Sequence, residues 1–148
     1  MDNIRSGWNV GAMFRTADGL GGGRMHLCGI TPTPEQPQVA KTALGAEKTV
    51  TWVYASNAVK HCQKLQQQGY VIWALEDTPE AEAIFGLQGE HLVCERRVLV
   101  VGNEVTGVDP AILALCERVL AIPMLGAKRS LNVAVAYGIA LSALQHLL

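Results

Sequence analysis

The sequence predicts an α/β fold in which a parallel β-sheet is flanked by helices. Short runs rich in β-branched and aromatic residues alternate with segments of helical pattern along the 148 residues, and this alternation is typical of such a sheet. Hydrophobic residues make up 49% of the chain and charged residues 17%, a composition that excludes disorder and supplies a buried core. The length suits one domain, residues 1–148.

Five strands are expected, and their β-branched and aromatic content suits strands buried on both faces. They lie at 24–30, 50–54, 70–76, 97–102 and 118–123. The opening "MDNI" is too short for a full strand, yet an amphipathic helix follows at once. We therefore expect the first strand of the sheet to be curtailed.

Helices are expected between these strands, at 10–18, 37–44, 56–68, 110–117 and 130–147. Ser56 is expected to cap one of them, Pro110 follows Asp109 in a first turn, and Gly69 suits a helix stop. The last segment has no charged residue, but polar residues interrupt it and many positions are Ala, so it predicts a buried helix and not a membrane span.

Charge and cysteine usage narrow the class of protein. The formal net charge is only −1, so any nucleic-acid binding must depend on local patches. Four scattered cysteines form no C-x-x-C pair and the four histidines add no ligand spacing, which favours reduced thiols in a cytoplasmic protein over a metal site. The polar start lacks the pattern of a signal peptide. The cysteines are Cys28, Cys62, Cys94 and Cys116.

The first segment with potential chemistry is "NVGAMFRTADGLGGG", residues 9–23. Asn9 can cap the following helix, and Arg15 follows within two helical turns. The alternative is a solvated arginine on an amphipathic helix. The glycines at 21–23 do not form a dinucleotide-binding fingerprint after a strand, so they are expected to make the turn into the next strand.

The second segment is "LVVGNEVTGVD", residues 99–109. A strand that ends at Gly102 is followed by Asn103, Glu104 and Gly107, which place a carboxylate and bare backbone at a carboxyl strand end. Ligands of open α/β sheets bind at such ends. The alternative is an ordinary strand-to-helix loop with Glu104 in water.

The third segment is "IPMLGAKRSLNVAVAYGIAL", residues 122–141. Its first three residues form an apolar lip, and Ser130 is expected to cap a helix whose first turn attracts an anion, with support from Lys128 or Arg129. The alternative is a plain cap with two solvated cations, and no Walker loop string is present. Together the second and third segments predict a cleft for a flat, partly apolar ligand such as an adenine nucleoside.

These three segments, in this order, resemble the three motifs of the SpoU/TrmH family of RNA ribose 2'-O-methyltransferases, within the SPOUT superfamily. The segment "KTALGAEKTV", residues 41–50, also resembles the family, so the resemblance covers nearly the whole chain. It implies an α/β fold with a C-terminal deep trefoil knot that builds the S-adenosylmethionine site. Such knots are exceptions to the usual topology rules. It also implies a homodimer, in a chain that lacks the RNA-binding extension of many relatives.

The resemblance implies a role for particular residues. Arg15 matches the arginine proposed to act in catalysis and Asn9 the asparagine that supports it. The other catalytic positions are Glu104, Ser130 and Asn132. Cofactor-binding positions are Val101, Gly102, Asn103, Glu104, Ile122, Pro123, Met124, Ser130 and Leu131.

The expected function is S-adenosylmethionine-dependent 2'-O-methylation of a ribose in tRNA or rRNA, by a cytoplasmic enzyme with no metal and no membrane contact. A catalytically silent RNA-binding or scaffold dimer with the same fold is the alternative. A domain for another nucleotide is the third possibility, which the missing Walker and Rossmann strings disfavour.

Overall fold

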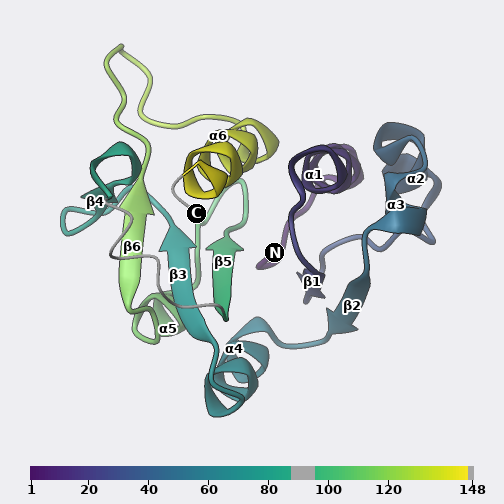
Figure 1. Ribbon diagram of the computed structural model, residues 1–148, viewed down its shortest axis with the longest axis horizontal. Helices are drawn as coiled ribbons and strands as arrows, with labels where there is room; N and C mark the ends of the chain where they lie inside the picture. The colour runs from purple at the N-terminus through teal and green to yellow at the C-terminus, as the bar shows by residue number, and fades with distance from the viewer. Residues whose placement is uncertain (88–95, 147–148) are drawn as a thin grey trace.

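The computed structural model describes residues 1–87 and 96–146. Helices and strands alternate along the chain, as Figure 1 shows. In chain order the elements are α1 (Gly7–Leu20), β1 (Met25–Cys28), α2 (Pro37–Ala43), α3 (Ala46–Thr49), β2 (Trp52–Ala55), α4 (Ala58–Gln67), β3 (Val71–Leu75), β4 (Glu82–Ala83), the 3-10 turn η1 (Ile84–Gly86), β5 (Arg97–Val101), α5 (Pro110–Leu113), β6 (Arg118–Ala121) and α6 (Val133–Gln145).

Every strand pair in the described residues is parallel. One sheet has the order β1-β2 and the other β4-β6-β3-β5. The first residues of the chain lie between the two, because Cys28 N–H donates to Met1 O (3.1 Å) and Asp2 N–H donates to Val101 O (2.9 Å). The opening residues form one parallel bridge, between Asp2 and Cys28, in agreement with the expectation that they are too few for a full strand.

Three predicted helix caps are wrong by a few residues. Ser6, not Asn9, caps α1, and its hydroxyl accepts from Asn9 N–H (3.3 Å). Asn57, not Ser56, caps α4, and Asn132, not Ser130, caps α6. A capping oxygen must reach an N–H two or three residues ahead, and each true cap meets that condition.

Other predicted boundaries are close. The five predicted strands are present, with shifts of one or two residues at most ends. Asp109 caps α5 with Pro110 at its start, and Gly69 (φ 84°) follows the end of α4. The helix expected over 110–117 ends at Leu113. Beyond it, Leu115 N–H donates to Ile112 O and Cys116 N–H to Leu113 O, so the hydrogen bonds span three residues as in turns, and the chain continues to β6.

Burial is less complete than the sequence predicts. The central strand β3 is buried on both faces, but β2 lies at an edge, where Tyr54 is half exposed. The apolar helix α6 packs Tyr137, Ala140 and Leu144 into the core and leaves Val135 52% exposed. The expectation of a buried last helix is therefore wrong for one face, which stays uncovered.

The described cysteines are reduced. Cys28 and Cys62 are buried and Cys116 is partly buried, all as free thiols, and burial raises the pKa of Cys62 and of Cys116 to about 11. Cys94 lies outside the described residues. No described helix is long and apolar enough to cross a membrane, and residues 1–87 and 96–146 contain no group of three or more metal-ligating side chains.

The contact between α1 and α2 makes a testable prediction about Gly11. A Cβ at Gly11 would overlap Thr42 Oγ1 and the Val39 carbonyl, whereas a Cβ at Gly19 meets nothing within 4 Å. We expect Gly11→Ala to lower the free energy of unfolding by about 1 to 3 kcal/mol through overpacking. The matched Gly19→Ala, on the same helix, should raise it by about 0.5 to 1 kcal/mol. Urea denaturation measures both, and equal effects would contradict close helix packing at Gly11.

Candidate functional site

A cavity of about 330 Å³ lies where β3, β5 and β6 end. The carboxyl ends of these strands meet at one edge, beneath the start of α6 (Figure 1). This is the edge at which open parallel sheets bind ligands. The volume falls within the range of small-molecule sites. The lining residues are Leu75, Glu76, Asp77, Val101, Gly102, Asn103, Glu104, Val105, Gly107, Ala121, Ile122, Met124, Arg129, Ser130, Leu131, Asn132, Val133 and Ala136.

The loop after β5 is closed tightly on itself. Asn103 and Gly107 exchange two backbone hydrogen bonds (3.0 and 2.9 Å), and Asn103 Oδ1 accepts from Val105 N–H (2.8 Å). A Cβ at Gly102 would overlap the backbone of Gly107 and Val108. The packing of the loop itself therefore requires glycine at position 102, whether or not a ligand approaches this backbone.

Glu104 joins this loop to the start of α1. Its carboxylate accepts hydrogen bonds from Arg5 N–H (2.8 Å), Ser6 N–H (3.1 Å) and Asn9 Nδ2 (3.0 Å). Partial burial favours the protonated acid, but these hydrogen bonds outweigh burial and lower the pKa of Glu104 below its ordinary value. The carboxylate is thus held ionised at neutral pH by the residues at the start of α1 whose N–H groups it accepts.

Asn132 extends this contact to the third segment. Its Nδ2 donates to Asn9 Oδ1 (3.1 Å), and its Oδ1 accepts from Ala134 N–H (2.9 Å) at the start of α6. The three predicted segments therefore meet in one chain of hydrogen bonds that runs Glu104, Asn9, Asn132. The structure brings these three predicted catalytic positions together.

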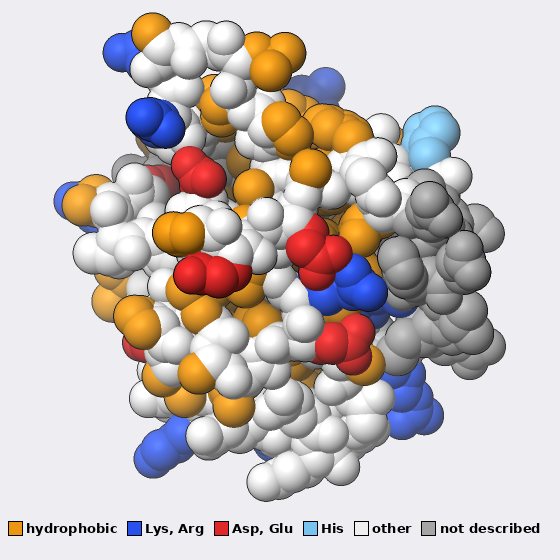
Figure 2. All heavy atoms as spheres, turned by 90° about the vertical axis from the view of Figure 1, so that its left-hand side faces the viewer, with side chains coloured by type: hydrophobic (Ala, Val, Ile, Leu, Met, Phe, Trp, Pro, Cys, Tyr) orange, Lys and Arg blue, Asp and Glu red, His pale blue; other side chains and the backbone are white. Residues whose placement is uncertain are grey.

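The loop between β6 and α6 projects from the body of the protein, and Figure 2 shows basic and apolar side chains together on that face. Leu125, Lys128, Arg129 and Ser130 on this loop are exposed. The anion site expected at Ser130 is not formed as predicted, because α6 begins three residues later and Asn132 already accepts from its first N–H groups.

Three predicted residues, Asn9, Pro123 and Arg15, lie outside the cavity wall. Asn9 is joined to that wall by its hydrogen bonds to Glu104 and Asn132. Pro123 lines an adjacent cavity of about 310 Å³ that also includes Lys128. Arg15 is exposed on α1, about 9 Å along the helix axis from Asn9. Among the described residues Arg15 has no hydrogen bond or ion pair, so its guanidinium is available to a ligand of the site.

Three acidic residues at or beside the site were not predicted from the sequence. Glu76 and Asp77 line the cavity, and Asp2 contacts the chain just after the loop that follows β5. Glu76 accepts from Val108 N–H (2.8 Å) and lies against Gly107, so it fastens the loop after β5 from the β3 side. Asp2 is 3% exposed and accepts from Asp109 N–H (2.9 Å). Glu76 is the last residue of the strand predicted over 70–76, and this position at a carboxyl strand end could have identified it. Nothing in the sequence links Asp2 to Asp109.

The model of the SpoU rRNA Methylase family matches residues 1–142. A 23S rRNA (guanosine-2'-O-)-methyltransferase RlmB from Pseudomonas syringae pv. tomato is 31% identical over 145 residues, which are 95% of this chain and 54% of that protein. The chain therefore spans about half the length of the curated relatives that it matches.

Solved structures agree with this relationship. An AdoMet-bound rRNA methyltransferase from Sinorhizobium meliloti has a TM-score of 0.88 at 25% identity, over 98% of this chain and 54% of that one. The A. aeolicus TrmH/SpoU tRNA modifying enzyme has a TM-score of 0.84 at 29% identity, over 99% and 72%. The family resemblance and the parallel sheet flanked by helices are confirmed; the trefoil knot and a single domain over 1–148 stay predictions.

The Glu104 contacts predict a pH-dependent contribution to stability. Because the pKa of Glu104 is lowered on folding, its contribution is present above the unfolded pKa and is lost as the pH falls through the folded pKa. Glu104→Gln should cost about 1 kcal/mol at pH 7, limited by solvent screening, and the cost should shrink below pH 4. Urea denaturation at pH 7 and pH 3.5 measures this. Glu80→Gln is the control, an exposed carboxylate without a described hydrogen bond, and a cost independent of pH would contradict the prediction.

Proposed function

Because the chain belongs to the SpoU rRNA Methylase family, we propose that it methylates a ribose 2'-hydroxyl of RNA with S-adenosylmethionine as the methyl donor. The observation that carries the proposal is the hydrogen-bonded chain Glu104, Asn9, Asn132, which joins all three motif segments beside one cavity. The curated relatives are named for 23S rRNA and the A. aeolicus protein for tRNA. We propose rRNA as the first substrate to test and tRNA as the second.

The residues present suit the cofactor. Apolar side chains of Leu75, Ile122, Leu131 and Val133 and the backbone of the Gly102 loop line the cavity, a combination that fits an adenine nucleoside with a polar tail. S-adenosylmethionine supplies an electrophilic methyl group when it is bound. The residues proposed to hold it are Val101, Gly102, Asn103, Glu104, Ile122, Met124, Ser130 and Leu131, with Pro123 shaping the neighbouring cavity.

The reaction requires the ribose hydroxyl to be positioned and to lose its proton. Asn9, Glu104 and Asn132 engage one another, so we assign them to positioning the loops, and the exposed Ser130 hydroxyl to contact with RNA or cofactor. Arginine stays protonated near neutral pH. We therefore propose that Arg15 orients an RNA phosphate or the reacting hydroxyl, and that it is not the base that removes the proton.

RNA contact is proposed to depend on a few cations around the site. Arg5, Arg15, Lys128 and Arg129 are exposed near the start of α1 and on the projecting loop, while the net charge of the chain is −1. A small number of phosphate contacts gives weak binding that falls as salt rises. An RNA substrate and reduced thiols suit a cytoplasmic enzyme.

The uncovered face of α6 supports a homodimer. Val135 is 52% exposed and Leu131, in the adjacent loop, is 37% exposed. Homodimer interfaces are apolar and depleted of charge at their core. We expect Val135→Glu to convert a dimer to a monomer, measured by light scattering at micromolar concentration. Ile30→Glu, at an exposed apolar site that follows β1 and is not part of α6, should leave the dimer intact; a monomeric wild type would contradict the proposal.

Cofactor binding tests the function first. We expect saturable binding of S-adenosylmethionine by calorimetry, weakened at least tenfold by Ala136→Leu, which adds bulk to the cavity wall. Ala143→Leu lies on the same helix outside that wall and should bind like wild type. Absence of binding by folded wild-type protein would count against the enzyme and favour the silent scaffold.

Methyl transfer is the second stage of this test. Purified chain should transfer tritiated methyl from S-adenosylmethionine to rRNA or tRNA, and alkaline digestion should leave an alkali-resistant dinucleotide that carries the 2'-O-methyl group. Arg15→Ala should reduce the transfer rate at least 100-fold while cofactor affinity stays unchanged, because Arg15 lies outside the cavity wall. Arg15→Lys should recover part of the rate if orientation of phosphate is its role. Cofactor binding without transfer to either RNA would overturn the proposed activity.

A further inference from the structure

An exposed tryptophan lies at the start of α1, one residue before Asn9 of the candidate site. Trp8 is 47% exposed, whereas Trp73 is 1% exposed and Trp52 packs partly buried against the core. An exposed indole forgoes the stabilisation that burial of so large an apolar surface supplies. Its position means that a substrate which reaches Asn9 also passes the Trp8 ring.

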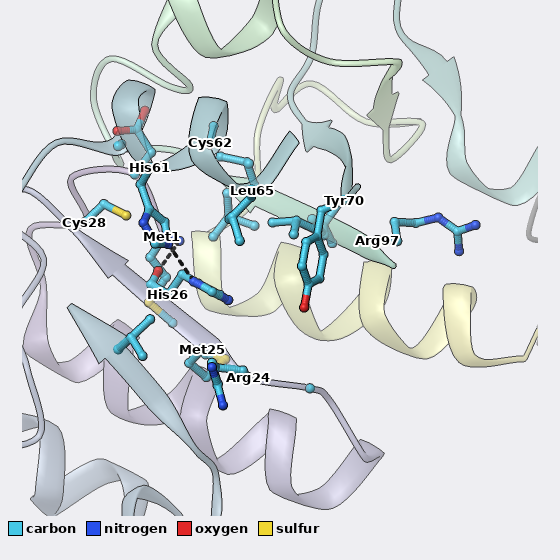
Figure 3. A pocket seen from close by; sticks show the side chains of 18 of the residues that line it. Met1, Arg24, Met25, His26, Cys28, His61, Cys62, Leu65, Tyr70 and Arg97 are labelled. Atoms are coloured by element: carbon cyan, nitrogen blue, oxygen red, sulfur yellow. Dashed lines mark hydrogen bonds between the residues drawn. The ribbon is translucent and has the colours of Figure 1, made fainter. Parts of the chain in front are cut away.

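The Trp8 ring has a cation beside it. Lys41, on α2, lies with Nζ 5.5 Å from the ring centroid. Other described aromatic rings with a cation nearby lie away from the site. Tyr70, with Arg96 6.0 Å from its ring, lines the cavity of about 990 Å³ between β1 and β5 that Figure 3 shows, and Trp73 is buried. Among the described aromatic residues, Trp8 therefore combines an adjacent cation with exposure beside the site.

The packing of α1 against α2 holds the Trp8 backbone in place and brings Lys41 to it. The hydroxyl of Thr42, the residue after Lys41, donates to the Trp8 carbonyl (3.2 Å). On the next turn of α1, the two helices lie so close that a Cβ at Gly11 would overlap Thr42 Oγ1. A ring on a backbone fixed in this way loses little freedom when a flat ligand stacks on it.

Arg15 lies on the same face of α1 as Trp8. The two are seven residues apart, close to two helical turns, so their side chains leave the helix in nearly the same direction, about 10 Å apart along its axis. Both are exposed, and α1 lies between α6 and α2 in Figure 1. No acidic residue occurs in α2, and α1 has only Asp18, near its far end. Trp8, Arg15 and Lys41 therefore form a surface that combines an aromatic ring with positive charge, which we call the Trp8 face.

We propose that Trp8 stacks on an unpaired RNA base next to the ribose that is methylated. A nucleotide carries a flat base and an anionic phosphate, and the Trp8 face offers a ring for the first and cations for the second. Trp8 adjoins Asn9, which bonds to Glu104 and Asn132, so a base stacked on Trp8 belongs to a nucleotide close to the reacting one. This inference rests on the proposed function, which makes RNA the substrate.

Stacking on Trp8 selects the class of RNA that the site accepts. In a duplex both faces of a base are covered by its neighbours, so a base reaches the indole only from a loop, a bulge or an end, or after it leaves the stack. Every base has a face that can stack on an aromatic ring. The Trp8 face therefore favours a target in an unpaired stretch of RNA and does not specify the base at this position.

Tryptophan fluorescence tests the contact without requiring catalysis, because a base stacked on an indole quenches its emission. We expect a single-stranded oligoadenylate of about 12 nucleotides, at low salt, to quench wild-type protein and to leave Trp8→Phe unquenched, since Trp52 and Trp73 are covered. A blunt G–C duplex of the same length should quench at least threefold less. Equal quenching of both proteins, or equal quenching by both RNAs, would overturn the stacking.

Substitutions at Trp8 separate stacking from a structural role. Trp8→Ala should weaken oligoadenylate binding at least fivefold and raise KM for rRNA or tRNA by a similar factor, with kcat and S-adenosylmethionine affinity little changed. Trp8→Tyr keeps an aromatic ring and should restore most of the affinity. Leu20→Ala removes an exposed apolar side chain at the other end of α1 and should bind RNA like wild type. Equal losses in Trp8→Ala and Trp8→Tyr would overturn the stacking.

The outcomes distinguish this inference from the proposed function. Methyl transfer with an unchanged KM in Trp8→Ala would overturn the stacking and leave the methyltransferase in place. Quenching at Trp8 with aromatic rescue, but without methyl transfer to rRNA or tRNA, would support the RNA contact and overturn the proposed activity. Absence of oligoadenylate binding by folded wild-type protein would overturn the stacking, whatever the methyl-transfer assay shows.

Discussion

The Glu104 carboxylate is the contact on which the site depends. It accepts two backbone N–H groups at the start of α1 and the Asn9 amide, and so joins residues nearly one hundred positions apart in sequence. Without these bonds the loop after β5 would lack its main contact with the first motif. Because Asn9 also engages Asn132, the orientation of one carboxylate influences all three walls of the site.

In this arrangement, polar residues of the three motifs hold the loops of the site in place in addition to their proposed part in the chemistry. Asn103 closes its own loop and reaches Asn3, and Glu76 fastens the same loop from β3. Groups that hold one another in this way lose little freedom when a ligand binds, which is the benefit of preorganisation. Arg15 differs, because it stands apart from this network and is available to a substrate.

The sequence predicted the parallel sheet, the alternation of elements and the convergence of the second and third segments, because strand pattern and strand-end glycines are local signals. The caps at Ser6, Asn57 and Asn132 were missed by a few residues, since Ser and Asn occur at neighbouring positions and only backbone geometry selects among them. The contacts of Asp2 with Asp109 join distant residues without any shared pattern. The exposure of Val135 could not be predicted either, because a uniformly apolar helix carries no signal for which face is covered.

The opening residues help to organise the site although they form only one bridge. Met1 to Asn3 bond to both β1 and β5, and their side chains and carbonyls reach the loop after β5. Parallel pairing in this region therefore has two consequences: it holds the two sheets together and it sets the position of the loop that lines the cofactor cavity. The bridge between Asp2 and Cys28 and the bond from Asp2 N–H to Val101 O supply both, so the position of the loop depends on backbone contacts that lie outside the cavity wall.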